Sequence, residues 1–283
     1  MKYHSLTKIA PAFALALSAQ LQLHAQDHGH LNVGALGTNQ DARLYFANGG
    51  DFASDSGYVK TLDFTNANRF AGYFQGNITL TALPTTAAHA GPDPSASAPG
   101  SFIQFSLACL EGPAGGSFAF WDVGTTAPSL SLAPGQGSTN LWRLSESNGS
   151  PGSDPYGHIH GRRFTATKPG IYKIGFTAFD TSTNGAGGSS IHMPSEQLAV
   201  WFQAGVNIRS VEPDEDEGHV HVKFGGRLGY RWQVEASELL GPQADWQPAG
   251  RPVVGADVFI EIIHEGAPGE VRFYRVQGTP VVP

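Results

Sequence analysis

Residues 156–180, YGHIHGRRFTATKPGIYKIGFTAFD, contain the signals that decide the fold. Residues 161–166 and 170–180 are rich in aromatic and β-branched side chains, which favours β-strands. The sequence Lys168-Pro169-Gly170 between them predicts a turn, because proline fixes one backbone angle and glycine accepts a positive φ. The stretch therefore predicts a β-hairpin, with His158 and His160 close to one end of it.

The rest of the chain repeats this pattern of short apolar runs separated by segments rich in its 36 glycines and 19 prolines. Helical periodicity is almost absent, and 40% hydrophobic residues are enough for a core, which excludes a disordered protein. The pattern predicts an all-β protein, an antiparallel β sandwich followed by a second, smaller β domain. The expected strands are residues 42–47, 70–80, 101–110, 117–122, 138–145, 161–166, 170–180 and 197–204 in the first domain, and 219–224, 230–237, 258–264 and 272–277 in the second.

The sequence predicts a signal peptide followed by two domains. Residues 1–25 combine two lysines, a short apolar run and a final alanine, which predicts a secretory signal peptide. The β sandwich is then expected over 26–205 and the small β domain over 219–283. Between them, residues 206–218 contain a run of acidic side chains that predicts a solvated linker; a calcium loop is the alternative, although the glycine and spacing of an EF-hand are missing.

Charge and cysteine content narrow the function further. The formal net charge is −7, and it becomes −9 when the lysines of the signal are removed, which argues against nucleic acid as a partner. No apolar run approaches the roughly 20 residues that span a bilayer, so we expect no transmembrane anchor and a secreted or periplasmic protein, with association to the cell surface as a variant. The single cysteine, Cys109, excludes a disulfide and is expected to be a buried apolar residue, with a metal thiolate as the alternative.

Three separated groups of histidines are the main functional signal. Histidines two residues apart in a strand point to the same face, and neutral imidazoles brought together by the fold suit Zn²⁺ or Cu²⁺. We therefore predict a zinc site, with copper as the alternative. The predicted metal ligands are His28, His30, His158, His160 and His192.

Two further histidine patterns leave alternatives open. Cleavage after Ala25 would expose the sequence Gln26-Asp27-His28, whose amine, peptide nitrogens and imidazole suit square-planar Cu²⁺. His219 and His221 repeat the His-x-His spacing beside the acidic run. We interpret this second pair as a solvated strand face, with a weaker metal site as the alternative.

Residues 157–172 follow the pattern Gly-His-x-His, then Phe-Thr-x-x-x-Pro-Gly-x-Tyr, which resembles bacterial surface-anchored domains associated with metal transporters. Residues 29–33 match that family's Gly-His-x-Asp/Asn-Val motif, and 197–202 fit its closing strand. The resemblance covers about 26–205 and implies zinc or related metal handling at the cell surface. It implies His30, His158 and His160 as ligands, and a metal transporter or cell-surface component as partner. The hydrophobic tail of the anchored members is missing.

The C-terminal domain has a resemblance of its own. Residues 230–237 and 272–276, with Trp246 between them, resemble a small β module found at the C-termini of secreted bacterial proteins, especially of the Verrucomicrobia type. The resemblance implies an accessory or attachment domain.

Motifs for catalysis are absent from the sequence. It contains no nucleophile elbow, zinc-protease helix, phosphate loop or dinucleotide fingerprint, and Glu111, Asp122 and Glu146 are scattered acids without a visible pairing. We therefore expect a protein that is not an enzyme, with metal-assisted hydrolysis as a minority alternative. The other function class is a non-catalytic adhesion or carbohydrate-binding protein, in which Trp121, Trp142 and Trp201 would stack on sugars.

Overall fold

The computed structural model describes residues 29–86, 91–214, 216–265 and 272–281. The predicted signal peptide and His28 lie outside the described residues, so both stay predictions. In the part of the chain that is described, no helix is long and apolar enough to cross a membrane.

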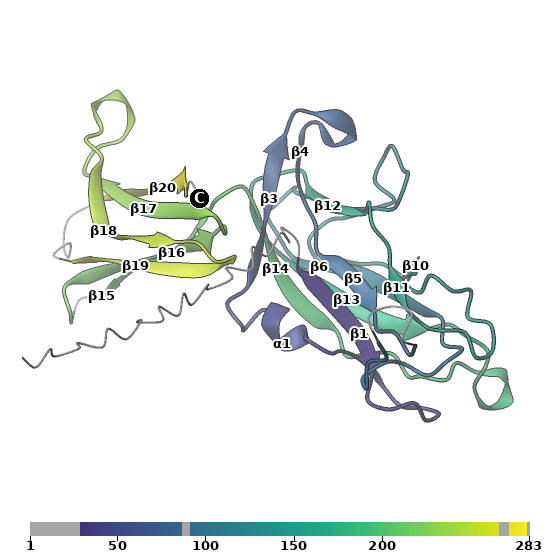
Figure 1. Ribbon diagram of the computed structural model, residues 1–283. Helices are drawn as coiled ribbons and strands as arrows, with labels where there is room; N and C mark the ends of the chain where they lie inside the picture. Colours follow the sequence, from purple (N-terminus) through teal and green to yellow (C-terminus); the bar gives the residue numbers. More distant parts are fainter. Residues whose placement is uncertain (1–28, 87–90, 215, 266–271, 282–283) are drawn as a thin grey trace, which may run out of the picture.

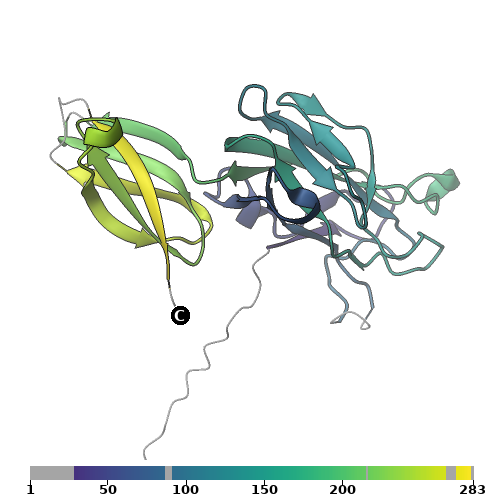
Figure 2. The ribbon, with the colours of Figure 1, turned by 90° about the horizontal axis from the view of Figure 1, so that it is seen from above.

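The protein is all-β, as the sequence predicted, and the described strands form two bodies that lie beside each other in both views (Figures 1 and 2). The helical parts among the described residues are the single turns α1 (Gly49–Phe52), η1 (Asn68–Phe70), η3 (Ala186–Gly188) and η4 (Gly241–Gln243). The strands of the N-terminal domain are β1 (His30–Ala35), β2 (Leu44–Phe46), β3 (Val59–Thr65), β4 (Tyr73–Gly76), β5 (Thr79–Ala82), β6 (Ile103–Glu111), β7 (Phe118–Trp121), β8 (Leu130–Leu132), β9 (Gln136–Gly137), β10 (Trp142–Arg143), β11 (Gly157–His158), β12 (Arg163–Ala166), β13 (Gly170–Asp180) and β14 (Leu198–Ala204).

Two sheets enclose the core of the N-terminal domain. The smaller sheet has the strand order β11-β5-β1-β2, and the larger one runs β10-β6-β13-β14-β3-β4-β12-β7-β8, with β9 added beside β6. Leu31 and Val33 of β1 point into the same hydrophobic cluster as Phe105 of β6 and Phe176 of β13. The sheets therefore form the two layers of a sandwich, and burial of these apolar side chains holds the layers together.

The hairpin predicted from residues 161–180 is wrong, although the turn and both strands are present. Strand β12 pairs with β4 and β7, whereas β13 pairs with β6 and β14. Two ladders of the sandwich are parallel, β1 with β5 and β14 with β3, whereas the other ladders between the described strands are antiparallel, as the sequence predicted. Both strands bury apolar side chains in the shared core, as Phe164 and Phe176 show, beside partners that are distant in the sequence, so the local turn does not decide these neighbours.

The C-terminal domain consists of two three-stranded antiparallel sheets, in the orders β15-β16-β19 and β18-β17-β20. They pack over a second core that includes Phe224, Trp232 and Val234. Its elements are β15 (Ile208–Asp214), β16 (His219–Gly226), β17 (Tyr230–Ser237), β18 (Gln247–Val254), β19 (Val258–Glu265) and β20 (Phe273–Pro280).

The structure differs from the predicted linker over residues 206–218. Residues 208–214 form β15, which pairs with β16 along its length. Ile208 packs against the second core, and this burial together with the backbone hydrogen bonds of the ladder outweighs the repulsion among the exposed acidic side chains.

The two domains are in direct contact. The backbone N–H of Val59 donates to the carbonyl of Asp257 at 3.0 Å, and that of Phe259 donates to the carbonyl of Gly57 at 2.8 Å. Arg227 Nη1 and Asp63 Oδ1 form an ion pair of 2.9 Å across the same boundary. These contacts give the boundary a defined geometry and place the start of β3 against the C-terminal domain.

Candidate metal site

Strand β5 brings two of the predicted ligands together, because it pairs with β1 on one side and β11 on the other. In the ladders, His30 lies opposite Thr79 and His158 lies opposite Thr81. The Thr81 hydroxyl oxygen lies 3.4 Å from Nδ1 of His30 and also 3.4 Å from Nδ1 of His158. One hydroxyl thus lies between two imidazoles whose residues are far apart in the sequence.

His160 extends this arrangement into a row. The ring centroids of His30 and His158 are 4.7 Å apart, and those of His158 and His160 are 4.4 Å apart. His30 and His158 are half-buried, whereas His160 is exposed. We call these three side chains the histidine row; solvent reaches it at His160, whereas Nε2 of His30 is buried.

Both Gly-His motifs owe their glycine to close packing. A Cβ at Gly157 would lie 1.7 Å from the carbonyl oxygen of Leu144, and a Cβ at Gly29 would lie 2.7 Å from the ring of Phe52. A larger residue at either place would push its strand outward. The glycines therefore allow the close packing that fixes the backbone positions of His30 and His158.

Sequence reasoning missed two residues beside the histidine row. One is Thr81, described above, and the other is Glu146, whose carboxylate accepts a 2.9 Å hydrogen bond from the backbone N–H of His158. Neither had a signal in the sequence: Thr81 is an ordinary strand residue, and Glu146 precedes the histidine pair by a turn-rich loop. Both become visible through the pairing of distant strands.

The imidazoles of the row are spaced as metal ligands are, but their nitrogens do not point toward one common position. Two imidazoles on one zinc ion, with Zn–N bonds of 2.0–2.1 Å, have centroids about 5 Å apart, close to the distances seen here. In the side-chain conformations of the structure, however, no group of three or more His, Cys, Asp or Glu residues within the described ranges is arranged to hold a metal ion. Joint coordination by the row therefore requires the imidazoles to rotate.

His192 does not belong to the row. It is 1% exposed, its Nε2 accepts a hydrogen bond of 2.9 Å from the backbone N–H of Ala98, and its Nδ1 lies 2.9 Å from the carbonyl oxygen of Ala42, to which it donates. Both ring nitrogens are thus engaged by the backbone, and the ring ties two loops to the segment before β14. This arrangement explains His192 as a structural residue, so we leave it out of the candidate site.

Cys109 is buried in β6, as predicted. Burial raises the pKa of its thiol to about 11, because the thiolate would lose its hydration. The thiol therefore stays protonated at neutral pH, and its place in the hydrophobic core favours the interpretation of Cys109 as a buried apolar residue.

The second His-x-His pair has different neighbours. In the C-terminal domain, His221 Nδ1 lies 3.5 Å from a carboxylate oxygen of Glu261 and its Nε2 lies 4.0 Å from one of Asp214. His219 Nδ1 lies 3.4 Å from Glu217. Both histidines are half-buried on a strand face, and carboxylates rather than other imidazoles surround them.

The tryptophans offered for sugar stacking are mainly core residues. Trp121 and Trp201 are 2% and 8% exposed, and Trp121 Nε1 donates to the Thr165 hydroxyl at 2.9 Å. Trp142 is half-buried and packs on Phe120 at a centroid distance of 5.0 Å. A buried ring cannot offer its face to a sugar, so these residues do not support the adhesion or carbohydrate reading.

Two of the scattered acids have partners that explain them. Asp122 accepts a 2.8 Å hydrogen bond from buried Arg162, and Glu111 lies 3.4 Å from Lys173 Nζ. They are ion-paired on different elements, so they do not form an acid–base dyad with each other.

Comparison with known proteins adds no relative: no protein-family model matches this chain, and no curated protein matches it. The resemblance of residues 157–172 to metal-transporter-associated domains therefore stays an expectation, and the site is judged on its geometry.

Proposed function

We propose that this protein binds a transition-metal ion through the histidine row, with zinc as the preferred ion and copper as the alternative. The observation that carries the proposal is the placement of His30, His158 and His160 side by side across β5. Neutral imidazole is a good ligand for both ions. The side chains must rotate for their nitrogens to converge.

The surroundings of the row support a cation site in two ways. The Thr81 hydroxyl faces the Nδ1 side of two rings, and such outer hydrogen bonds orient metal-ligating histidines. We therefore expect Nε2 to be the coordinating nitrogen of His158 and of His30, whose Nε2 is buried, so that its ring must turn before it can bind the ion. Glu146, held next to His158, adds negative charge that favours a bound cation.

We further propose a role in metal handling outside the cytoplasm, at a bacterial cell surface or in the periplasm. The support is the signal-like sequence of residues 1–25 and the family resemblance of residues 26–205. The partner would be a metal transporter or another cell-surface component that delivers or receives the ion.

The first test is the metal content of the protein, purified without a histidine tag and measured by mass spectrometry. Wild type incubated with zinc and desalted is expected to retain about one ion per chain, and the variant His158→Ala/His160→Ala is expected to lose it. The matched control is His219→Ala/His221→Ala, which removes an identical spacing from the C-terminal domain and is expected to keep the ion.

The same experiment decides against the proposal in two cases. Absence of zinc and copper from the wild type after incubation with an excess of either ion would remove the metal site. Loss of the ion in the control variant alone would move the site to the C-terminal domain.

A further inference from the structure

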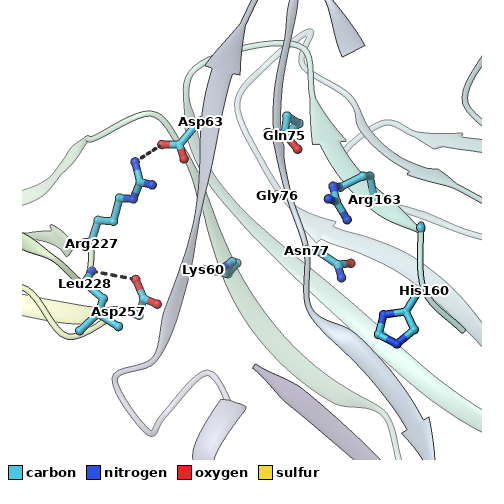
Figure 3. A pocket seen from close by; sticks show the side chains of 11 residues that line it. Lys60, Asp63, Gln75, Gly76, Asn77, His160, Arg163, Arg227, Leu228 and Asp257 are labelled. Atoms are coloured by element: carbon cyan, nitrogen blue, oxygen red, sulfur yellow. Dashed lines mark hydrogen bonds and ion pairs between the residues drawn. The ribbon is translucent and has the colours of Figure 1, made fainter. Parts of the chain in front are cut away.

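A cleft of about 340 Å³ lies where the two domains meet. Figure 3 shows that strands β3 and β4 divide it: Arg227, Leu228 and Asp257 of the C-terminal domain lie on one side, and Asn77, Arg163 and His160 lie on the other, with Lys60 between them. The volume falls within the range of small-molecule sites, about 300–1,000 Å³. The cleft is therefore large enough for a ligand of the size of one sugar.

Positive charge gathers in this cleft, although the whole chain is acidic. Three cationic side chains line it, Lys60, Arg163 and Arg227, against the two carboxylates of Asp63 and Asp257. Asp63 is ion-paired with Arg227 at 2.9 Å, and Asp257 accepts a 3.0 Å hydrogen bond from the backbone N–H of Leu228. Cations therefore exceed acids here in a protein of net charge −7, and this excess favours an anionic ligand.

The two cations of the N-terminal domain are held in place by the fold. Lys60 belongs to β3 and is 9% exposed, so its ammonium group has little room to leave the cleft. Arg163 begins β12, is half-buried, and uses Nη1 to donate to the carbonyl of Arg162 at 2.9 Å. Such partly buried cations bind a carboxylate more strongly than solvent-exposed ones, because water screens them less.

The side chain of Asn77 offers the cleft a hydrogen-bond acceptor that needs a donor. Its Nδ2 donates to the Thr79 hydroxyl at 3.1 Å, while its Oδ1 is buried and has no hydrogen-bond partner within the described part of the protein. A buried acceptor without a partner destabilises the protein, because it has lost its hydrogen bonds to water. A hydroxyl group of a bound ligand would satisfy it.

The remaining lining is hydrophilic. Among the described residues that line the cleft, Leu228 alone has an apolar side chain, and Gln75 adds a second amide. A ligand for this site would therefore carry polar groups along its whole length rather than an apolar ring.

We propose that the cleft between the domains binds a small polyhydroxylated carboxylate, that is, a sugar acid. Its carboxylate meets Lys60 and Arg163, and a hydroxyl donates to Asn77 Oδ1. The binding of this ligand is a function beyond metal binding and does not depend on it. Because His160 lies at the edge of both sites, the two are tested separately, on protein that has been stripped of metal with a chelator and then desalted.

The experiment is calorimetric titration of the metal-free, full-length protein with D-galacturonate. Galactose, which lacks the carboxylate, and acetate, which lacks the hydroxyls, are the matched ligand controls. Wild type is expected to bind galacturonate and to bind each control ligand at least about tenfold more weakly, since one charge-assisted hydrogen bond is enough for that difference.

Variants assign the binding to the cleft. Lys60→Gln, Arg163→Gln and Asn77→Asp are each expected to weaken galacturonate binding at least about tenfold, the last by placing a negative charge beside the ligand. Lys168→Gln is the control, because this exposed lysine donates to the Ala114 carbonyl away from the cleft. Circular dichroism and thermal unfolding check that each variant is folded.

Three outcomes overturn the proposal. Wild type does not bind galacturonate, or the folded variants Arg163→Gln and Asn77→Asp bind it as strongly as wild type does. In the third outcome, wild type binds acetate and inorganic phosphate as strongly as galacturonate. The last outcome would make the cleft a general anion site. Because the titrations use metal-free protein, failure here does not affect the metal proposal.

Discussion

The two His-x-His pairs of this protein have identical spacing and different surroundings. His158 and His160 stand beside a third imidazole, His30, which a neighbouring segment supplies through β5. His219 and His221 stand beside the carboxylates of neighbouring strands and turns. The comparison teaches that a local spacing sets only the direction of two side chains, whereas the strands paired on either side decide whether imidazoles or carboxylates complete the cluster.

The largest difference between the pairs is expected in the pH dependence of metal binding. Protons and zinc compete for the same imidazole nitrogens, so a site with three histidine ligands should lose zinc affinity steeply from pH 7 to pH 5, by more than a site with a single histidine. Zinc titrations at both pH values, with a fluorescent competitor, measure this. A shallow loss of affinity would instead indicate a site with one histidine and carboxylates, as in the C-terminal domain.

The next largest effect is expected from substitution of His192, the structural histidine. It concerns the free energy of unfolding rather than metal binding. His192→Ala removes a buried ring and leaves the groups of Ala98 and Ala42 without their partner, which should lower the free energy of unfolding by about 3 kcal/mol. His160→Ala, at an exposed position, should change it by less than about 0.5 kcal/mol. Urea unfolding of the metal-free variants tests the contrast; similar losses in both would refute the division between structural and ligand histidines.

The smallest effect concerns His264 in β19. Burial lowers its pKa, and the nearby charge of Arg272 lowers it further, while its Nδ1 lies 3.1 Å from the Tyr274 hydroxyl. The unfolded chain therefore takes up a proton near pH 6.5 that the folded chain refuses, so stability is full above that pH and declines as the pH falls below it. Thermal unfolding of wild type and His264→Gln between pH 7.5 and pH 5 measures this, and we expect a flatter pH dependence in the variant. Parallel curves would contradict the assignment.

Sequence patterns predicted the strands well where apolar and polar residues alternate or where the residues are apolar throughout. Strands β13 and β17 begin and end where the sequence predicted them, because long runs of alternating or apolar side chains mark their whole length. Strand β3 was missed, since Val59 to Leu62 are all buried and include Lys60 and Thr61, which read as polar surface. Strand β15 was missed for a related reason. Its acidic residues are typical of a solvated linker, so the sequence did not show that Ile208 is partly buried.

The candidate site was predicted in part. That His30, His158 and His160 lie together agrees with the sequence prediction of a cluster from separated histidines. The sequence could not separate His192 from them, because its role depends on two backbone groups that lie 94 and 150 residues away in the chain. The cleft between the domains had no signal at all, since β3, β4, β12 and two loops of the C-terminal domain each supply one or two of its side chains.

The sequence by itself determined the all-β class, the division into a larger and a smaller domain, and which residues can act as metal ligands. These follow from local chemistry: turn residues, apolar runs and the donor atoms of histidine. The tertiary structure alone decided which strands are neighbours, which histidine is structural, and where cations and an unsatisfied amide oxygen meet at the domain boundary. The physical reason is that pairing and packing are set by the total apolar surface and hydrogen bonds that distant segments bury together, a quantity that no short stretch of sequence contains.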